Sequence, residues 1–392
     1  MNMPVKMALV VKSLDPDKGG HENYINRLLR GLMEKNYQVW CFAEGFGSRS
    51  VEHSDLTKIR IRPFKLEPGL RMLWFNYRAQ QLIRRHPVKF DLVFTTGNVT
   101  FGDLYRAGGG VHETYMKNCL GALEQFQPKH LAAKSLQRRL FMKNTPRILI
   151  TNSEMVKKDI QKRYGVSDST IRVIRNGIDL DRFNPTVVGR TREIIRRKHG
   201  FEEHDFVCLF TAGGGKRKGL SELLRSISII ENSNVKLLVV GRTNKSDLNQ
   251  TITRYGLEER VAYVGYQPQI EQFYGVADCL VFPSKYDAAA NVVCEALASG
   301  LPVITTETNG NAELIEANKN GYVIPRANHY GEMRECMERL AGHENRPAMC
   351  QHAIATGQQF TMDRHITEFE GTIQDCMRQK YLNYEQSTSY QL

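Results

Sequence analysis

The sequence lacks the signatures of several protein classes. None of its eight cysteines forms a CxxC pair and the HExxH pattern is absent, so neither a zinc site nor a disulfide framework is indicated. No apolar run approaches the roughly 18 residues of a membrane-spanning helix. No Ser/His/Asp or Cys/His arrangement suggests nucleophilic catalysis, and neither glycine-rich loop has Walker A or G-x-G-x-x-G spacing. We therefore expect no metal site, no resident cofactor and no dinucleotide site.

The charge of the chain points to an anionic partner. Its 54 basic and 42 acidic residues give a formal net charge of +12, which favours nucleotide phosphates or an acidic membrane surface. Nucleic acid is the weakest candidate, because no nucleic-acid-binding module or aromatic-basic repeat is present. The scattered cysteines and an N-terminus typical of a β-strand, without a signal-peptide cleavage pattern, predict reduced thiols in a cytoplasmic protein.

Strands and helices alternate along the chain in two successive series. The 392 residues suffice for two domains, and the alternation predicts an α/β fold of two Rossmann-like, doubly wound domains. We expect domains at 1–185 and 186–360, with a polar linker over 186–199, and a final helix over 361–392 that returns to the first domain. Strands are predicted at Val5–Val11, Tyr37–Phe42, Ile59–Ile61, Asp91–Thr95, Arg147–Thr151, Ile171–Ile174, Phe206–Thr211, Val235–Val240, Val261–Val264, Cys279–Phe282, Val303–Thr305 and Tyr322–Ile324.

The segment Tyr286–Pro302 carries the most informative pattern. Asp287 and Glu295 are eight positions apart, in a predicted loop and helix between two apolar strands. Ligands bind at the carboxyl ends of strands in such sheets, and carboxylates accept hydrogen bonds from sugar hydroxyls. The alternative is a solvated Asp and an ordinary helical Glu. We favour a binding role, because Glu295 lies among apolar residues and a carboxylate there needs a partner.

Two glycine-rich loops precede predicted helices and could bind anions. The first ends in Gly19-Gly20, where the backbone could approach a diphosphate beside a helix N-terminus, although paired glycines are often only a turn. The second, residues 213–219, combines glycines with three cations. Its Arg217 and Lys218 are the best candidates for pairing with a diphosphate, and the alternative is a basic surface turn.

A third glycine run leads to a histidine. Residues 108–110 are glycines and precede His112, after the strand predicted at Asp91–Thr95. A lone histidine is usually structural. Here the glycine run would bring it to a loop at the edge of the predicted cleft, where its imidazole could bond a substrate hydroxyl.

The stretch 125–147 is basic and contains no acid. Its six cations are interleaved with leucine and phenylalanine, and Pro128 can begin a helix. A basic amphipathic helix can lie on an anionic membrane. An ordinary helix with a solvated basic face is the other interpretation.

Together these motifs resemble the retaining glycosyltransferases of family 4, which have the GT-B fold. The resemblance covers most of the chain and includes the turn Asn176–Pro185, similar to the family's hinge. It implies that Gly19, Gly20, Arg217 and Lys218 bind the diphosphate and that Glu295 holds the ribose of a nucleotide sugar. It also implies that Asp287, an aspartate where the family has glutamate, and His112 lie at the transferred sugar.

Within the family, Asp103–Tyr115 and Tyr286–Thr306 resemble lipopolysaccharide core glucosyltransferases that act on heptose. The resemblance implies transfer of glucose from a UDP-linked donor to a lipid-linked glycan, without a metal, by an acceptor-binding and a nucleotide-sugar-binding domain. It places the protein on the inner face of the cytoplasmic membrane. Alternatives are a non-hydrolysing epimerase or a phosphorylase of the same fold, or a non-catalytic nucleotide- or lipid-binding module. Lipid binding and slow hydrolysis of nucleotide sugars would separate these hypotheses.

Overall fold

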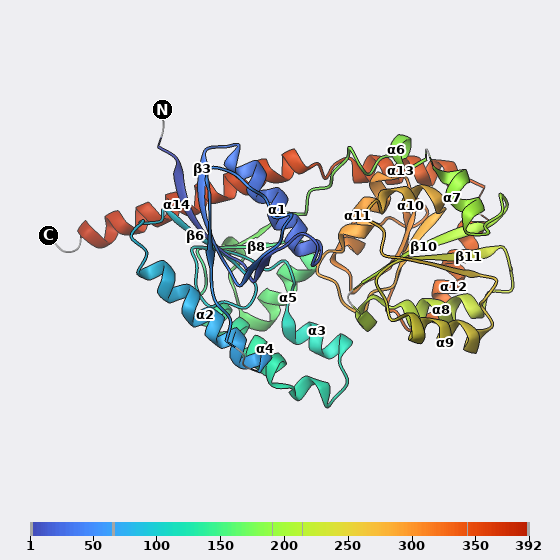
Figure 1. The fold of residues 1–392 in the computed structure, drawn as a ribbon, viewed down its shortest axis with the longest axis horizontal. Helices are drawn as coiled ribbons and strands as arrows, with labels where there is room; N and C mark the ends of the chain where they lie inside the picture. Colours follow the sequence, from blue (N-terminus) through green and yellow to red (C-terminus); the bar gives the residue numbers. More distant parts are fainter. Residues whose placement is uncertain (1–2, 65–66, 190, 214, 343, 390–392) are drawn as a thin grey trace. The chain divides into compact units, whose positions relative to one another are not determined.

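A computed structural model describes residues 3–64, 67–189, 191–213, 215–342 and 344–389 (Figure 1). The chain forms two compact units. One unit comprises Met1–Gly177 with Asp363–Leu392, and the other comprises Ile178–Met362. Each unit is built around its own parallel sheet, so the predicted fold class of two doubly wound α/β domains is confirmed.

The sheet of the first unit has seven strands and its order reverses beside β1. β1 pairs with β3 on one side and with β6 on the other. The topological switch point therefore lies between the carboxyl ends of β1 and β6. In spatial order the strands are β5 (Leu56–Arg60), β3 (Tyr37–Ala43), β1 (Val5–Val10), β6 (Leu92–Thr96), β7 (Leu104–Arg106), β8 (Ile148–Thr151) and β9 (Ile171–Val173). A separate parallel pair joins β2 (Ser13–Leu14) to β4 (Gly45–Phe46).

Helices cover both faces of this sheet. Alternate residues of β1, such as Met7 and Leu9, pack with α1 and with Phe369 and Ile373 of α14 in one hydrophobic core. The C-terminal helix therefore belongs to the first unit, far in sequence from its neighbours. The helices are α1 (Gly20–Met33), α2 (Pro68–Arg84), α3 (His112–Cys119), α4 (Pro128–Met142), α5 (Glu154–Tyr164) and α14 (Met362–Ser389), with 3-10 turns at Glu124–Phe126 and Asp168–Thr170.

The sheet of the second unit repeats the same order with six strands. Its switch point lies between β10 and β13, which pair in parallel. In spatial order the strands are β12 (Val261–Gly265), β11 (Val235–Gly241), β10 (Phe206–Ala212), β13 (Cys279–Phe282), β14 (Val303–Thr306) and β15 (Gly321–Ile324). The helices are α6 (Pro185–Gly189), α7 (Arg192–Lys198), α8 (Leu220–Ser228), α9 (Lys245–Tyr255), α10 (Glu271–Val276), α11 (Asn291–Ala298), α12 (Tyr330–Ala341) and α13 (Arg346–Gly357), with 3-10 turns at Gly215–Lys218 and Gly310–Leu314.

The prediction of a polar linker at 186–199 is wrong. Most of this stretch forms α6 and α7, which pack against α10. Arg192 Nη2 lies 2.7 Å from Asp278 Oδ1, and the buried Arg196 donates to Asp278 Oδ2 at 3.3 Å and to the carbonyl oxygen of Val276 at 3.0 Å. The sequence alone suggests that these arginines are exposed to solvent, because the carboxylate with which they pair lies about 80 positions later.

A second difference concerns β7. This strand of three residues lies between β6 and His112 and was not predicted, because a run of three residues ending in Arg106 carries no clear alternation. His112 therefore follows β7 and not the strand at 92–96. The added strand places the glycine run 108–110 directly beside the switch point.

Two candidate ligand sites at the strand ends

The loop after β10 ends in a glycine that permits a close approach. Gly219 has φ +81°, and a Cβ there would lie 2.1 Å from the carbonyl oxygen of Pro283, which follows β13. The tight contact brings the loops after β10 and β13 together at the switch point of the second unit. Arg217 and Lys218 lie in the 3-10 turn just before it, and Gly214 lies outside the described residues.

Arg217 and Asp287 form an ion pair across these two loops. Arg217 Nη1 donates to Asp287 Oδ2 at 2.5 Å and to the carbonyl oxygen of Tyr286 at 2.9 Å. Both side chains are largely buried, so solvent screens the pair less than it would on an open surface. Two residues that the sequence separates by 70 positions thus hold each other in place.

The loop that carries Asp287 is fixed by asparagines that the sequence analysis missed. Buried Asn309 accepts a hydrogen bond from the backbone N–H of Ala290 at 3.2 Å, and Asn311 donates to the carbonyl oxygen of Ala290 at 2.9 Å. The Asp287 backbone also exchanges hydrogen bonds with Thr308 and Gly310. These contacts hold Asp287 on a rigid loop. The Thr-Asn-Gly-Asn sequence after β14 is typical of a turn and could have indicated these asparagines.

Lys218 is a cation in a poorly solvated position. Its Nζ lies 5.0 Å from the centre of the Phe282 ring. Desolvation lowers the pKa of Lys218, and the negative charges of Asp287 and Glu295 oppose this shift. Because water screens this ammonium weakly, an anion that reached it would be bound strongly.

Glu295 has a partner in the same unit, as its apolar surroundings required. The buried Tyr274 hydroxyl, on α10, donates to Glu295 Oε2 at 2.7 Å. Burial and the nearby carboxylate raise the pKa of Tyr274 well above its usual value, so the phenol stays a donor. Tyr274 was missed because it lies 21 positions before Glu295, on a different helix. Arg217, Lys218, Asp287 and Glu295 thus come together in the second unit as two cations and two carboxylates.

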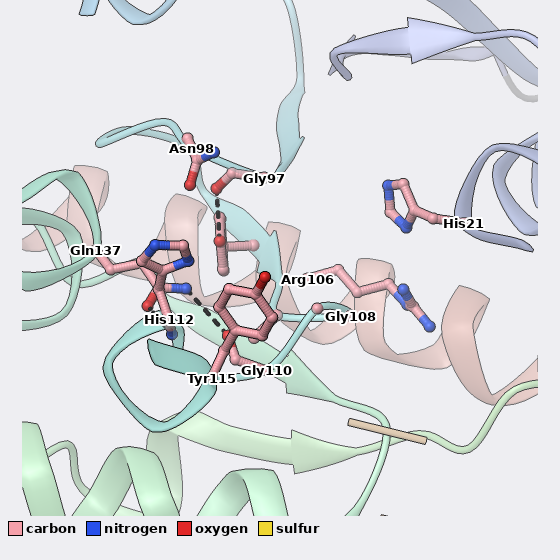
Figure 2. A pocket seen from close by; sticks show the side chains of 12 residues that line it. His21, Gly97, Asn98, Arg106, Gly108, Gly110, His112, Tyr115 and Gln137 are labelled. Atoms are coloured by element: carbon pink, nitrogen blue, oxygen red, sulfur yellow. Dashed lines mark hydrogen bonds between the residues drawn. The ribbon is translucent and has the colours of Figure 1, made fainter. Parts of the chain in front are cut away.

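The first unit has a pocket of about 240 Å³ at the ends of β6 and β7 (Figure 2). Its walls come from the start of α1, the turn after β6 and the glycine run after β7. In Figure 2, His21 and the Arg106 guanidinium lie on one side of the view, and His112 and Gln137 lie on the other. Lining residues include His21, Gly97, Asn98, Arg106, Gly109 and His112.

Two side chains of α4 hold His112. Gln137 accepts from the His112 backbone N–H at 2.8 Å and donates to the carbonyl oxygen of Gly110 at 3.0 Å, so one amide closes the loop. His112 Nε2 lies 3.1 Å from Nδ1 of buried His130, and the two rings stack. Burial, and then His130, lower the pKa of His112 to about 4. The imidazole is therefore neutral near pH 7 and can bond a hydroxyl group.

The first glycine loop forms a helix N-terminus. Gly19 is the N-cap of α1 and Gly20 is the first helical residue, and no side chain caps this end. His21 follows immediately and lines the pocket, with Nε2 at 3.3 Å from Thr96 Oγ1. The first backbone N–H groups of α1 have no partner within the helix and can bind an anion.

The basic stretch 125–147 includes α4, and most of its apolar stripe faces the protein. Leu136, Leu140 and Phe141 are buried and cannot face a membrane, whereas Leu131 of the same stripe is 46% exposed. Lys134 lies 3.7 Å from Glu113, and Arg147 lies 3.7 Å from Asp103. The other four cations, which have no ion-pair partner among the described residues, are Lys129, Arg138, Arg139 and Lys143.

Two features are absent from the residues that the structure describes. These residues contain no cluster of three or more His, Cys, Asp or Glu side chains placed to hold a metal ion. They also contain no helix that is long and apolar enough to cross a membrane.

Comparison with known proteins adds an independent finding. Residues 191–354 match the model described as "Glycosyl transferases group 1", and residues 18–182 match "Glycosyltransferase Family 4". A probable transglycosylase of Burkholderia thailandensis is 30% identical over 297 residues, which is 76% of each chain. The lipopolysaccharide glucosyltransferase WaaG of Escherichia coli is 24% identical over 311 residues, 78% of this chain and 82% of WaaG.

Solved structures show the same architecture. The crystal structure of WaaG matches with a TM-score of 0.80 at 20% identity, over 92% of this chain and 98% of that chain. HepE of Anabaena, in complex with UDP-glucose, matches with a TM-score of 0.71 at 18% identity, over 94% of this chain and 99% of that chain. These likenesses establish the GT-B fold of two parallel α/β sheets.

Proposed function

Since the chain belongs to glycosyltransferase family 4, a retaining family, we propose that it transfers glucose from UDP-glucose to a lipid-linked glycan such as the lipopolysaccharide core. The observation that carries the proposal is the set of two cations and two carboxylates at the switch point of the second unit. A nucleoside-diphosphate sugar needs both kinds of group: cations for its diphosphate and carboxylates for its hydroxyls. The complex of HepE with UDP-glucose supports the choice of donor.

In this proposal the second unit binds the donor. Arg217 and Lys218 bind the diphosphate, Glu295 accepts from the ribose hydroxyls, and Asp287 accepts from a hydroxyl of the sugar. The ion pair with Asp287 and the bond to the Tyr286 carbonyl preorganise Arg217 before the donor arrives. As the bond from the sugar to the diphosphate breaks, negative charge grows on the leaving group. The two cations stabilise that charge without reorganising.

In this proposal the first unit binds the acceptor, and three of its residues are assigned to the donor. Gly19 and Gly20 offer backbone N–H groups to the diphosphate at the start of α1. His112, neutral and held by Gln137 and His130, hydrogen-bonds a hydroxyl of the transferred sugar. The turn at Asn176–Pro185, which contains the border between the two units, serves as the hinge.

We place the enzyme peripherally on the inner face of the cytoplasmic membrane. The support comes from α4 and the turn before it, where cations without carboxylate partners adjoin exposed apolar side chains. Leu123 is 88% exposed and Phe126 is 72% exposed, and they lie six and three positions before Lys129. Cations attract anionic headgroups, and apolar tips can enter the interface.

The donor assignment is tested by a screen of nucleotide sugars. We expect UDP-glucose to raise the melting temperature of the wild-type protein more than GDP-mannose or ADP-glucose, since specific binding stabilises the folded state. We also expect the enzyme to hydrolyse UDP-glucose slowly and release UDP when no acceptor is present, and this release should persist in EDTA. A larger shift with another nucleotide sugar would change the donor, and no shift with any of them would contradict the proposal.

The membrane assignment is tested by liposome sedimentation. Replacing Arg138, Arg139 and Lys143 with Gln removes three cations worth about 1 kcal/mol each, so binding to anionic vesicles should fall roughly a hundredfold. The matched control replaces the exposed Arg197, Lys198 and Lys245, an equal loss of charge in the second unit. Equal sedimentation of both variants would show that α4 is not the anchor.

A further inference from the structure

Arg106 is a buried cation that lacks a carboxylate partner among the described residues. Only 2% of its surface is exposed, at the end of β7. Its guanidinium lies over the Tyr24 ring at 3.9 Å, and Nη2 donates to Asn176 Oδ1. Its Nε is buried without any hydrogen-bond partner. An arginine has five N–H donors, and the donor on Nε has no acceptor here.

The second unit shows how the same chain treats a buried arginine that is purely structural. Arg196 is 6% exposed, and it donates to Asp278 and to three backbone carbonyl oxygens. Burying a charge without such compensation is costly. The contacts of Arg106 with Tyr24 and Asn176 do not neutralise the charge of its guanidinium. A negatively charged ligand would neutralise that charge.

The surroundings of Arg106 leave room for such a counter-charge. A Cβ on Gly108 would lie 2.0 Å from Arg106 Nη1, so the first glycine of the run makes space for the guanidinium. Gly109 has no atom within 4 Å of its ideal Cβ position and lines the pocket. His21, in the first turn of α1, lines the same pocket. A guanidinium and two histidines, His21 and His112, therefore border one open space.

We propose that this pocket is an anion subsite for the acceptor, in which Arg106 binds a phosphate or carboxylate group on the sugar that receives glucose. The inference rests on the proposed function, because it assigns the acceptor to the first unit. It restricts the class of acceptor to glycans that carry a negatively charged group. Burial, and then the positive charge of Arg106, lower the pKa of the nearby His365 to about 4.

The test titrates inorganic phosphate and glucuronate into the whole enzyme while NMR follows the ring signals of His21 and His112. Saturating UDP occupies the cations of the second unit, sodium chloride keeps the ionic strength constant, and methyl glucoside is the neutral control. We expect saturable shifts with phosphate, glucuronate or both, which also identifies the anionic group. Arg106→Gln should abolish the shifts and leave the UDP affinity unchanged.

A second pair of variants covers the case in which Arg106→Gln does not fold. Gly109→Asp adds a carboxylate in open space beside the retained arginine and should also abolish the response, whereas the uncharged Gly109→Asn should reduce it less than threefold. A response that persists in Arg106→Gln, or no response to either anion in the wild type, would overturn the proposal. A tenfold loss of UDP affinity in Arg106→Gln would also overturn it, because the anion would then be the donor diphosphate. Failure of the proposed function is seen separately, as absence of any nucleotide-sugar binding by the wild type.

Discussion

The two units use the same strand order but treat charge in opposite ways at their switch points. In the second unit, Arg217 and Lys218 face Asp287 and Glu295, so cations and carboxylates balance before a ligand binds. In the first unit, Arg106 lines an open pocket together with His21 and His112, whose imidazoles are neutral because burial lowers the pKa of each to about 4. One fold therefore offers a balanced site suited to a ligand with both phosphates and hydroxyls, and a positive site suited to an anion.

The largest effect should come from removing a cation of the balanced site. Arg217→Ala or Lys218→Ala should lower transfer about 10²–10³-fold, since one preorganised group is typically worth roughly 2.7–4 kcal/mol at a developing charge. The measurement is UDP release from the preferred donor under saturating acceptor. Lys216→Ala is the matched control, because Lys216 is exposed in the same turn. Equal losses in all three variants would mean that only the charge of the loop matters.

The positive site should make the first unit sensitive to acid. The pKa of His365 is about 4 in the folded protein against 6.5 ordinarily, so the unfolded chain takes up the proton first. The stability from the neutral imidazole is present above pH 6.5 and is lost as the pH falls toward 4. We expect this group alone to cost about 2 kcal/mol by pH 5.

Urea unfolding of the wild type and His365→Gln at pH 7 and pH 5 measures this effect. Glutamine does not titrate, so the variant should lose about 2 kcal/mol less of its unfolding free energy between the two pH values. Equal losses in both proteins would show that burial and Arg106 do not lower the pKa of His365 in the folded protein.

A smaller effect should follow from removing the hydrogen bond that positions Glu295, one of the two carboxylates of the balanced site. Tyr274→Phe removes the hydroxyl that donates to Glu295 at 2.7 Å, and a hydrogen bond to a charged group is worth about 1.5 kcal/mol. The affinity for UDP, measured by calorimetry, should fall roughly tenfold. Tyr322→Phe, which removes a hydroxyl bonded to Asn318 in the same unit, should leave it unchanged. A normal affinity in Tyr274→Phe would mean that Glu295 needs no such support.

Local patterns predicted the strands, the glycine loops and the carboxylates because each is written in adjacent residues. The apolar runs of β10 and β13 are unmistakable, and Asp287 lies five positions after the end of β13. The pairing of Arg217 with Asp287 and of Tyr274 with Glu295 could not be predicted, because strand order, not sequence distance, brings them together. Arg106 was overlooked for a related reason: an arginine that ends a short strand looks solvated until its burial is known.

The most direct test of the contrast between the two sites is hydrogen–deuterium exchange of the wild-type protein with and without UDP. We predict slower exchange in peptides that cover 215–219 and 285–297, where the cations and carboxylates of the second unit meet the nucleotide. Peptides that cover 104–112 should be unchanged, because UDP carries no group for the Arg106 pocket. Protection at 104–112 with none at 215–219 would contradict the account.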